Sequence, residues 1–235
     1  MVQSDPKLKL PTSAELPCSD DTPVDNENQN LLPNILLFLL KFIWAKRDDW
    51  FFGVDMGVYH TTGVSHLVPV VPDGFLSLGV ERHKDGESRK SYVVWEEREL
   101  VPIFALEIVS LTYGGEYDTK AALYAKLGVL YYLVYNPQYW QRECPTDTCY
   151  ERRQPFELYR LVNGSYQLQI GEPFWMPEIG LGIGRSLYQD GSRTMDALYW
   201  YDQQSTRYLT PEEQLELVQQ QLSQYRHQFG DLPEG

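Results

Sequence analysis

The chain has 235 residues, with 33 Asp and Glu against 20 Lys and Arg, so its formal net charge is −13. This length is sufficient for one well-cored domain with tails. A chain this acidic does not attract polyanions over its whole surface, which counts against a general nucleic-acid coat protein but does not exclude a nuclease, whose acids can hold a cation.

Cysteine usage and the N-terminus bear on the compartment. The odd set Cys18, Cys144 and Cys149, with no basic-then-apolar leader at the N-terminus, predicts a reducing, cytoplasmic setting without disulfides. Cys144 and Cys149 lack a second pair of soft ligands, so we expect no structural zinc. The apolar run 31–45 is interrupted and shorter than the about 20 residues of a membrane span, so we expect no membrane partner.

The N-terminal part predicts a tail followed by a helix. Residues 1–24 are rich in Pro, Ser, Thr and Asp without hydrophobic periodicity, which is typical of a mobile tail. Residues 25–47 read as a helix. The helix has two possible starting points in the sequence. One is the polar group 25–28, and the other is Pro33, because proline suits the first turn of a helix.

The middle of the chain alternates apolar runs with turn residues. Residues 103–110 form the most apolar run and predict a buried central strand, and the helix that follows ends at Gly128, a good C-cap. Asn163-Gly164 between alternating runs predicts a hairpin. The predicted strands are 51–59, 67–71, 75–80, 103–110, 130–135, 156–162 and 166–170, with a loop over 81–100 and a helix over 117–127. This order predicts an α/β or α+β core, in which helices flank a central mixed β-sheet.

A C-terminal amphipathic helix is predicted over 210–235, after a domain that spans 25–209. Thr210-Pro211 with Glu213 is a capping box with proline at the first helical position. The apolar residues then step by three and four over about two heptads. They are Leu215, Val218, Leu222, Tyr225 and Phe229. This seam suits docking on the domain, which we expect, or a homodimer with a second copy.

Three charged residues stand out around the predicted strands. Glu107 lies inside the apolar run 103–110, where a carboxylate is costly unless a cation or hydrogen bonds compensate it. Asp73, read alone, is a turn residue, and Lys120 alone is a surface lysine of a helix. For Tyr124, the sequence favours a role in packing over a role in catalysis. Asp55 has two interpretations, as a strand-edge residue or as an outer member of an acid cluster.

Together these motifs resemble a known family. The motifs are Pro-Asp at 72–73, Leu-Glu-Ile-Val-Ser at 106–110, Lys-x-x-x-Tyr-Ala-x-Leu-Gly-Val at 120–129 and Tyr-Tyr-Leu-Val-Tyr-Asn-Pro at 131–137. In order and spacing they resemble a family of restriction-endonuclease-like proteins that is abundant in phototrophic bacteria and belongs to the PD-(D/E)XK nuclease superfamily. The resemblance covers most of residues 25–209 and implies a restriction-endonuclease-like core.

The resemblance implies a site that hydrolyses DNA phosphodiester bonds with Mg²⁺ or Mn²⁺. Asp73 and Glu107 match the two metal-binding acids, and the backbone carbonyl of Ile108 would complete the protein ligands. Lys120 matches the lysine that orients or polarises the attacking water. Glu27 on the first helix matches the acid that many superfamily members place near the metal.

One position departs from the general superfamily pattern. The lysine that normally follows two residues after the Glu is absent, and Val109 stands there. The long stem of Lys120 makes a lysine relocated onto the next helix plausible. The basic clusters of the chain are short, at 82–84, 89–90, 120 with 126, and 152–153. The alternative function is a catalytically idle binding or scaffold module with the nuclease fold, which the acidic net charge and these weak clusters would suit.

Overall fold

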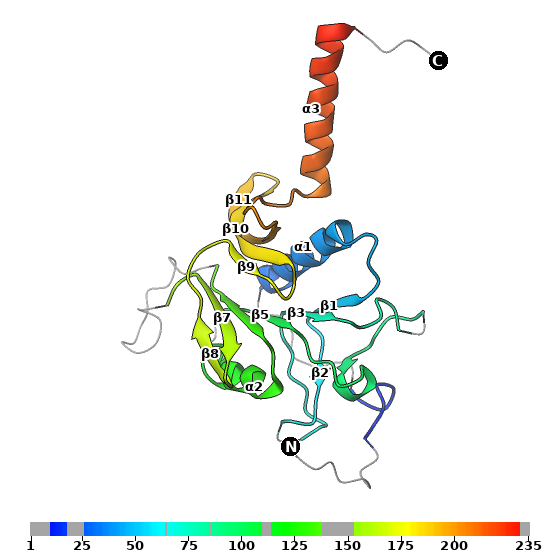
Figure 1. The fold of residues 1–235 in the computed structure, drawn as a ribbon, viewed down its shortest axis with the longest axis vertical. Helices are drawn as coiled ribbons and strands as arrows, with labels where there is room; N and C mark the ends of the chain where they lie inside the picture. The colour runs from blue at the N-terminus through cyan, green and yellow to red at the C-terminus, as the bar shows by residue number, and fades with distance from the viewer. Residues whose placement is uncertain are drawn as a thin grey trace.

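The computed structural model describes residues 10–17, 26–63, 65–84, 86–109, 114–137 and 153–230 (Figure 1). The three cysteines, most of the predicted tail and the start of the loop after residue 109 lie outside the described residues.

Within the described residues, six strands form a central sheet with the order β1-β3-β5-β6-β7-β8. The neighbours β5 and β6 run parallel, and every other neighbouring pair is antiparallel. The strands are β1 (Trp50–Val54), β3 (Gly74–Leu78), β5 (Phe104–Ile108), β6 (Tyr131–Tyr135), β7 (Phe156–Val162) and β8 (Ser165–Leu168). Helix α2 (Thr119–Leu127) makes the crossover from β5 to β6, as a parallel pair requires. The predicted mixed α/β core is confirmed.

One face of the central sheet packs on α1 (Glu27–Ile43) and on a second, antiparallel sheet. That sheet consists of β9 (Phe174–Met176), β10 (Leu181–Asp190) and β11 (Arg193–Tyr201). Leu32, Leu36 and Leu40 of α1 are fully buried in this cluster, and the Trp200 indole donates to the Leu36 carbonyl oxygen at 3.0 Å. The hairpin of β10 and β11 therefore holds α1 against the central sheet. The sequence patterns did not indicate this arrangement.

The opposite face of the sheet packs on α2. Its buried cluster contains Ala105 and Val109 of β5 and its extension, Tyr132 of β6, and Tyr124 and Leu127 of α2. Side chains alternate along β5, so Glu107 also points to the α2 face, while Leu106 and Ile108 point to α1.

Two strand predictions need correction. The run 51–59 is broken at Asp55, whose φ is 47°, so β1 ends and the short β2 (Val58–Tyr59) turns away to pair in parallel with β4 (Tyr92–Val93). The predicted strand 67–71 is wrong, because only Val70 bridges to Val58. The prolines at 69 and 72 have no N–H to donate to a ladder. The predicted loop 81–100 contains β4 and the short 3₁₀ helix Val94–Glu96.

Helix and turn boundaries largely follow their local chemistry. Helix α1 begins at Glu27, with Asn26 as the capping side chain, so the alternative start at Pro33 is wrong and this proline lies inside the helix. Gly128 ends α2 in the left-handed conformation, as predicted. Asn163 and Gly164 have φ values of 51° and 80° and join β7 to β8 in the predicted hairpin.

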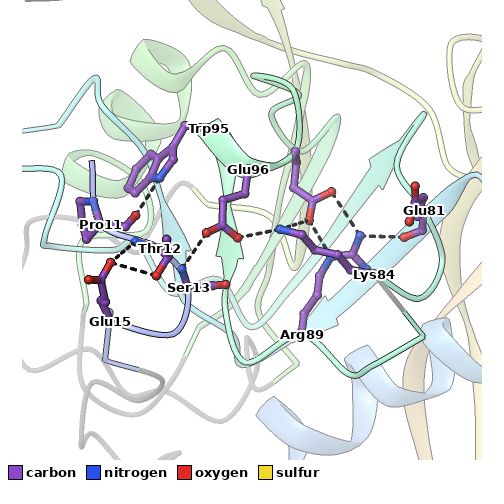
Figure 2. Close-up of polar contacts among 10 residues, drawn as sticks. Pro11, Thr12, Ser13, Glu15, Glu81, Lys84, Arg89, Trp95 and Glu96 are labelled. Atoms are coloured by element: carbon purple, nitrogen blue, oxygen red, sulfur yellow. Dashed lines mark hydrogen bonds and ion pairs between the residues drawn. The ribbon is translucent and has the colours of Figure 1, made fainter. Parts of the chain in front are cut away.

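Residues 10–17, which we expected in a mobile tail, lie against the β2–β4 region (Figure 2). The Ser13 amide donates to the Glu96 carboxylate at 2.8 Å, and the Trp95 indole donates to the Pro11 carbonyl oxygen at 2.9 Å. Leu16 is buried beside Tyr59 and Val93. The sequence reads as a tail because this segment carries a single buried apolar side chain and is held mainly by polar contacts.

Helix α3 (Pro211–Phe229) begins at the predicted capping box and extends away from the rest of the chain, shown in red in Figure 1. The apolar seam residues Leu215, Val218, Leu222 and Tyr225 are exposed. The expected docking of this seam on the domain is therefore wrong. Among the described residues, no helix has the length and apolar character to cross a membrane.

Candidate active site

The ends of three neighbouring strands bring three acidic residues side by side. Gly74 of β3 pairs with Leu106 of β5 and with Val54 of β1. Extending both registers by one residue places Asp73 opposite Glu107 on one side and opposite Asp55 on the other. Cross-strand neighbours lie about 5 Å apart on a common face. The sheet register therefore explains why acids far apart in the sequence meet.

Asp73 is fixed by the backbone at the end of β5. Its Oδ2 accepts the Ile108 N–H at 2.5 Å, and its own carbonyl oxygen accepts the Asp55 N–H at 3.2 Å. Burial and the nearby Glu107 carboxylate raise the pKa of Asp73 to about 8, and Asp55 adds to the rise. When both groups are ionised, their charges repel one another, and a bound cation would offset this repulsion.

Glu107 is buried, with 1% of its surface exposed, and both of its carboxylate oxygens are bonded. Oε2 pairs with Lys120 Nζ at 2.8 Å, and Oε1 accepts from the Tyr124 hydroxyl at 2.6 Å. Both partners come from α2, where positions four apart share one face. Asp118 caps the start of this helix by accepting from the Thr119 N–H, which sets the turn that carries Lys120.

The charges in this cluster depend on one another. Burial raises the pKa of Glu107, while Lys120 and the Tyr124 hydroxyl oppose the rise. Burial alone would lower the pKa of Lys120, but the Glu107 carboxylate outweighs it and holds this pKa above its ordinary value. Lys120 is therefore a stable cation beside the two acids. Burial and the Glu107 charge raise the pKa of Tyr124 well above its usual range, so this group remains a neutral donor.

The donor set suits a hard divalent cation. Mg²⁺ prefers oxygen ligands, uses one or two protein carboxylates and keeps several waters. Asp73 and Glu107 supply two such carboxylates, and Lys120 is the cation that pairs with Glu107, while burial and the Glu107 charge raise the pKa of Asp73. Within the described part of the chain, no group of three or more His, Cys, Asp or Glu side chains is arranged to hold a metal ion. The fit is thus to a two-carboxylate site completed by water and substrate oxygens.

The two other predicted metal ligands, Glu27 and the Ile108 carbonyl, differ in their placement from Asp73 and Glu107. Glu27 sits at the start of α1, exposed, and its carboxylate pairs with Arg193 of β11. Since α1 covers the face of the sheet opposite to Glu107, we do not include Glu27 in the site. Ile108 does lie at the site. Its backbone N–H, and not its carbonyl oxygen, makes the contact with Asp73.

Two further residues join the site. Tyr124 contacts Glu107 directly, whereas its sequence context favoured packing alone. The useful indication was its position four residues after Lys120 on a short helix. Asp55, which the sequence left open, bonds to Asp73 through its backbone and raises the pKa of that carboxyl. No local pattern reveals this, because the register of β1 on β3 creates it.

A comparison with protein families matches residues 21–188 to Uma2, described as a putative restriction endonuclease. The chain belongs to the Uma2 family. Comparisons with curated proteins and with solved structures gave no match. Uma2 membership supports a nuclease, and restriction-endonuclease-like proteins generally use divalent metals. The Uma2 match spans the strands and the helix that carry Asp73, Glu107 and Lys120.

Proposed function

We propose that this chain is a divalent-metal-dependent endonuclease that hydrolyses phosphodiester bonds of DNA, with Asp73, Glu107 and Lys120 as its catalytic residues. The observation that carries the proposal is the meeting of these three side chains at the ends of β3 and β5. There Glu107 is held by Lys120 at 2.8 Å, and Asp73 is held by the Ile108 amide at 2.5 Å.

Asp73 and Glu107 would hold the cation, which we propose to be Mg²⁺ or Mn²⁺. A bound cation of this kind makes its water more acidic and offsets negative charge that develops on the phosphate. Asp73 is suited to binding because a cation that displaces its proton would offset the repulsion that then arises between two ionised carboxylates. Ile108 and Tyr124 fix the orientation of the two carboxylates through one hydrogen bond each.

Lys120 would act through its charge. Its pKa is held above the ordinary value, so it carries a proton at neutral pH and does not serve as a general base from that state. A protonated amine beside the acids can orient the attacking water and neutralise the charge of the pentavalent transition state. Its position on α2 would supply the charged group that Val109, directly after β5, cannot supply.

Cleavage of supercoiled plasmid by the purified full chain tests the proposal. With Mg²⁺ or Mn²⁺ present, we expect nicked and then linear DNA from the wild type. Asp73→Asn, Glu107→Gln and Lys120→Met should each lower the rate by at least about 100-fold, the scale of lost electrostatic catalysis.

Glu97→Gln is a matched control. Glu97 and Arg89 form a second buried ion pair, with N–O separation 2.8 Å, outside the site. Its loss should cost stability and leave cleavage intact. Equal cleavage by Glu107→Gln and wild type would refute the proposed site.

One observation favours a second candidate, the idle nuclease-fold module that binds without turnover. Both Glu107 oxygens are already engaged by Lys120 and Tyr124, which leaves this carboxylate compensated without a cation. Binding of DNA with no cleavage in either metal, and with unchanged affinity in Asp73→Asn, would support this candidate over the endonuclease.

A further inference from the structure

Helix α3 carries an apolar stripe that stays exposed among the residues that the structure describes. Leu215 and Val218 are each 58% exposed, Leu222 is 39% exposed and Tyr225 is 48% exposed. Their spacing of three, four and three residues puts them on one face, and Figure 1 shows the helix extending away from both sheets. A contiguous apolar stripe on an isolated helix marks an interaction surface.

We propose that α3 pairs in antiparallel orientation with α3 of a second copy of this chain. The distribution of charge along the helix selects both the partner and the direction. Glu212, Glu213 and Glu216 lie in its first two turns, and Arg226 and His227 lie in its last turn. A parallel pair would set like ends and like helix dipoles side by side. An antiparallel pair sets the acidic end of each helix against the basic end of the other.

A specific register follows from the apolar spacing. When Val218 lies opposite Leu222 of the second copy, Leu215 lies opposite Tyr225 of that copy, and the twofold axis repeats both layers. Flanking positions then bring Glu212 against Arg226 of the second copy. The other flanking positions carry glutamine, so no like charges meet. They are Gln214, Gln219, Gln221 and Gln228. Complementary flanking charges set orientation in paired helices.

A groove at the base of α3 would extend this surface. It is a cavity of about 610 Å³ between α1 and the start of α3, with Phe38, Phe42 and Pro211 in its lining. Phe38 is 57% exposed and Phe42 is 48% exposed. In the antiparallel register the far end of the second helix passes Pro211. Because 19 residues make a helix of only about 28 Å, the groove adds apolar area that the helix pair alone lacks.

The oligomeric state of the full chain tests the proposal, by light scattering from micromolar to sub-millimolar concentration. We expect a concentration-dependent shift toward twice the chain mass. Val218→Glu and Leu222→Lys should each remain monomeric, because each places a charge in an apolar layer. Gln220→Lys and Gln220→Glu, on the opposite face of α3, are the matched controls and should still dimerise. A monomeric wild type would overturn the proposal.

Mixing the two monomeric variants tests the direction. In the antiparallel register, Glu at 218 of one chain meets Lys at 222 of the other, and the other three layers are native. The mixture should therefore dimerise. A parallel pair would leave both charges against apolar residues, and a mixture that stays monomeric would overturn the antiparallel arrangement. These results are independent of nuclease activity, so failure here leaves the proposed catalytic site untouched.

Discussion

Replacement of Lys120 by Met should destabilise the metal-free protein by about 3 kcal/mol. Removing one partner of a buried ion pair costs about 3–5 kcal/mol, because the other charge is left unpaired. Glu107 is 1% exposed, so little water can replace the ammonium group. The Lys120 side chain is 31% exposed and the Tyr124 hydrogen bond remains, which places the expected cost at the lower end. Met keeps most of the aliphatic stem.

Urea unfolding followed by tryptophan fluorescence would measure this change in the free energy of unfolding. In thermal unfolding of a chain of this length, a loss of 3 kcal/mol should lower the melting temperature by about 6–12 °C. Without Lys120, the pKa of Glu107 in the folded protein should rise further. The loss of stability should therefore grow as the pH increases, because Glu107 ionises more readily in the unfolded chain than in the folded one. The double variant Lys120→Met with Glu107→Gln, which removes the unpaired charge, should recover part of the loss.

Lys126→Met is the control for this experiment, because Lys126 is an exposed lysine of the same helix. It should change the free energy of unfolding by less than about 0.5 kcal/mol. If Lys120→Met proved no more destabilising than Lys126→Met, the ion pair with Glu107 would not exist in solution and the account of the site would be refuted.

Three further predictions concern single side chains. Tyr124→Phe removes a donor to the buried Glu107 carboxylate and should cost about 2 kcal/mol in urea unfolding, while an unchanged midpoint would contradict the hydrogen bond. Gly53→Ala should destabilise β1, because the added Cβ would lie 2.2 Å from the Phe75 ring, and a wild-type melting temperature would contradict this packing. Burial lowers the pKa of His60, so stability should be lost as pH falls below about 6.5, and His60→Gln should flatten that slope.

Local chemistry in the sequence predicted the elements that depend on local interactions. The Asn163-Gly164 turn, the Gly128 C-cap and the Thr210 capping box each act within a few residues, and each is found where predicted. A buried acid in an apolar strand required a partner, and Glu107 has Lys120 and Tyr124. These inferences needed no knowledge of distant parts of the chain.

Features that depend on long-range packing were missed. The position of α1 is set by the β10–β11 hairpin through contacts such as Trp200 with Leu36, which no local pattern encodes. That packing also takes Glu27 to the face away from the site, where it pairs with Arg193. The sequence likewise left Asp55 undecided, because only the register of β1 on β3 brings it to Asp73.

The most direct test of the central claim is calorimetric titration of Mn²⁺ into the purified full chain, repeated with DNA present. The account predicts saturable binding by the wild type and by the control Glu97→Gln, and loss of that binding in Asp73→Asn and in Glu107→Gln. Wild-type binding by Asp73→Asn, or no binding by the wild type even with DNA present, would contradict a cation site formed by Asp73 and Glu107.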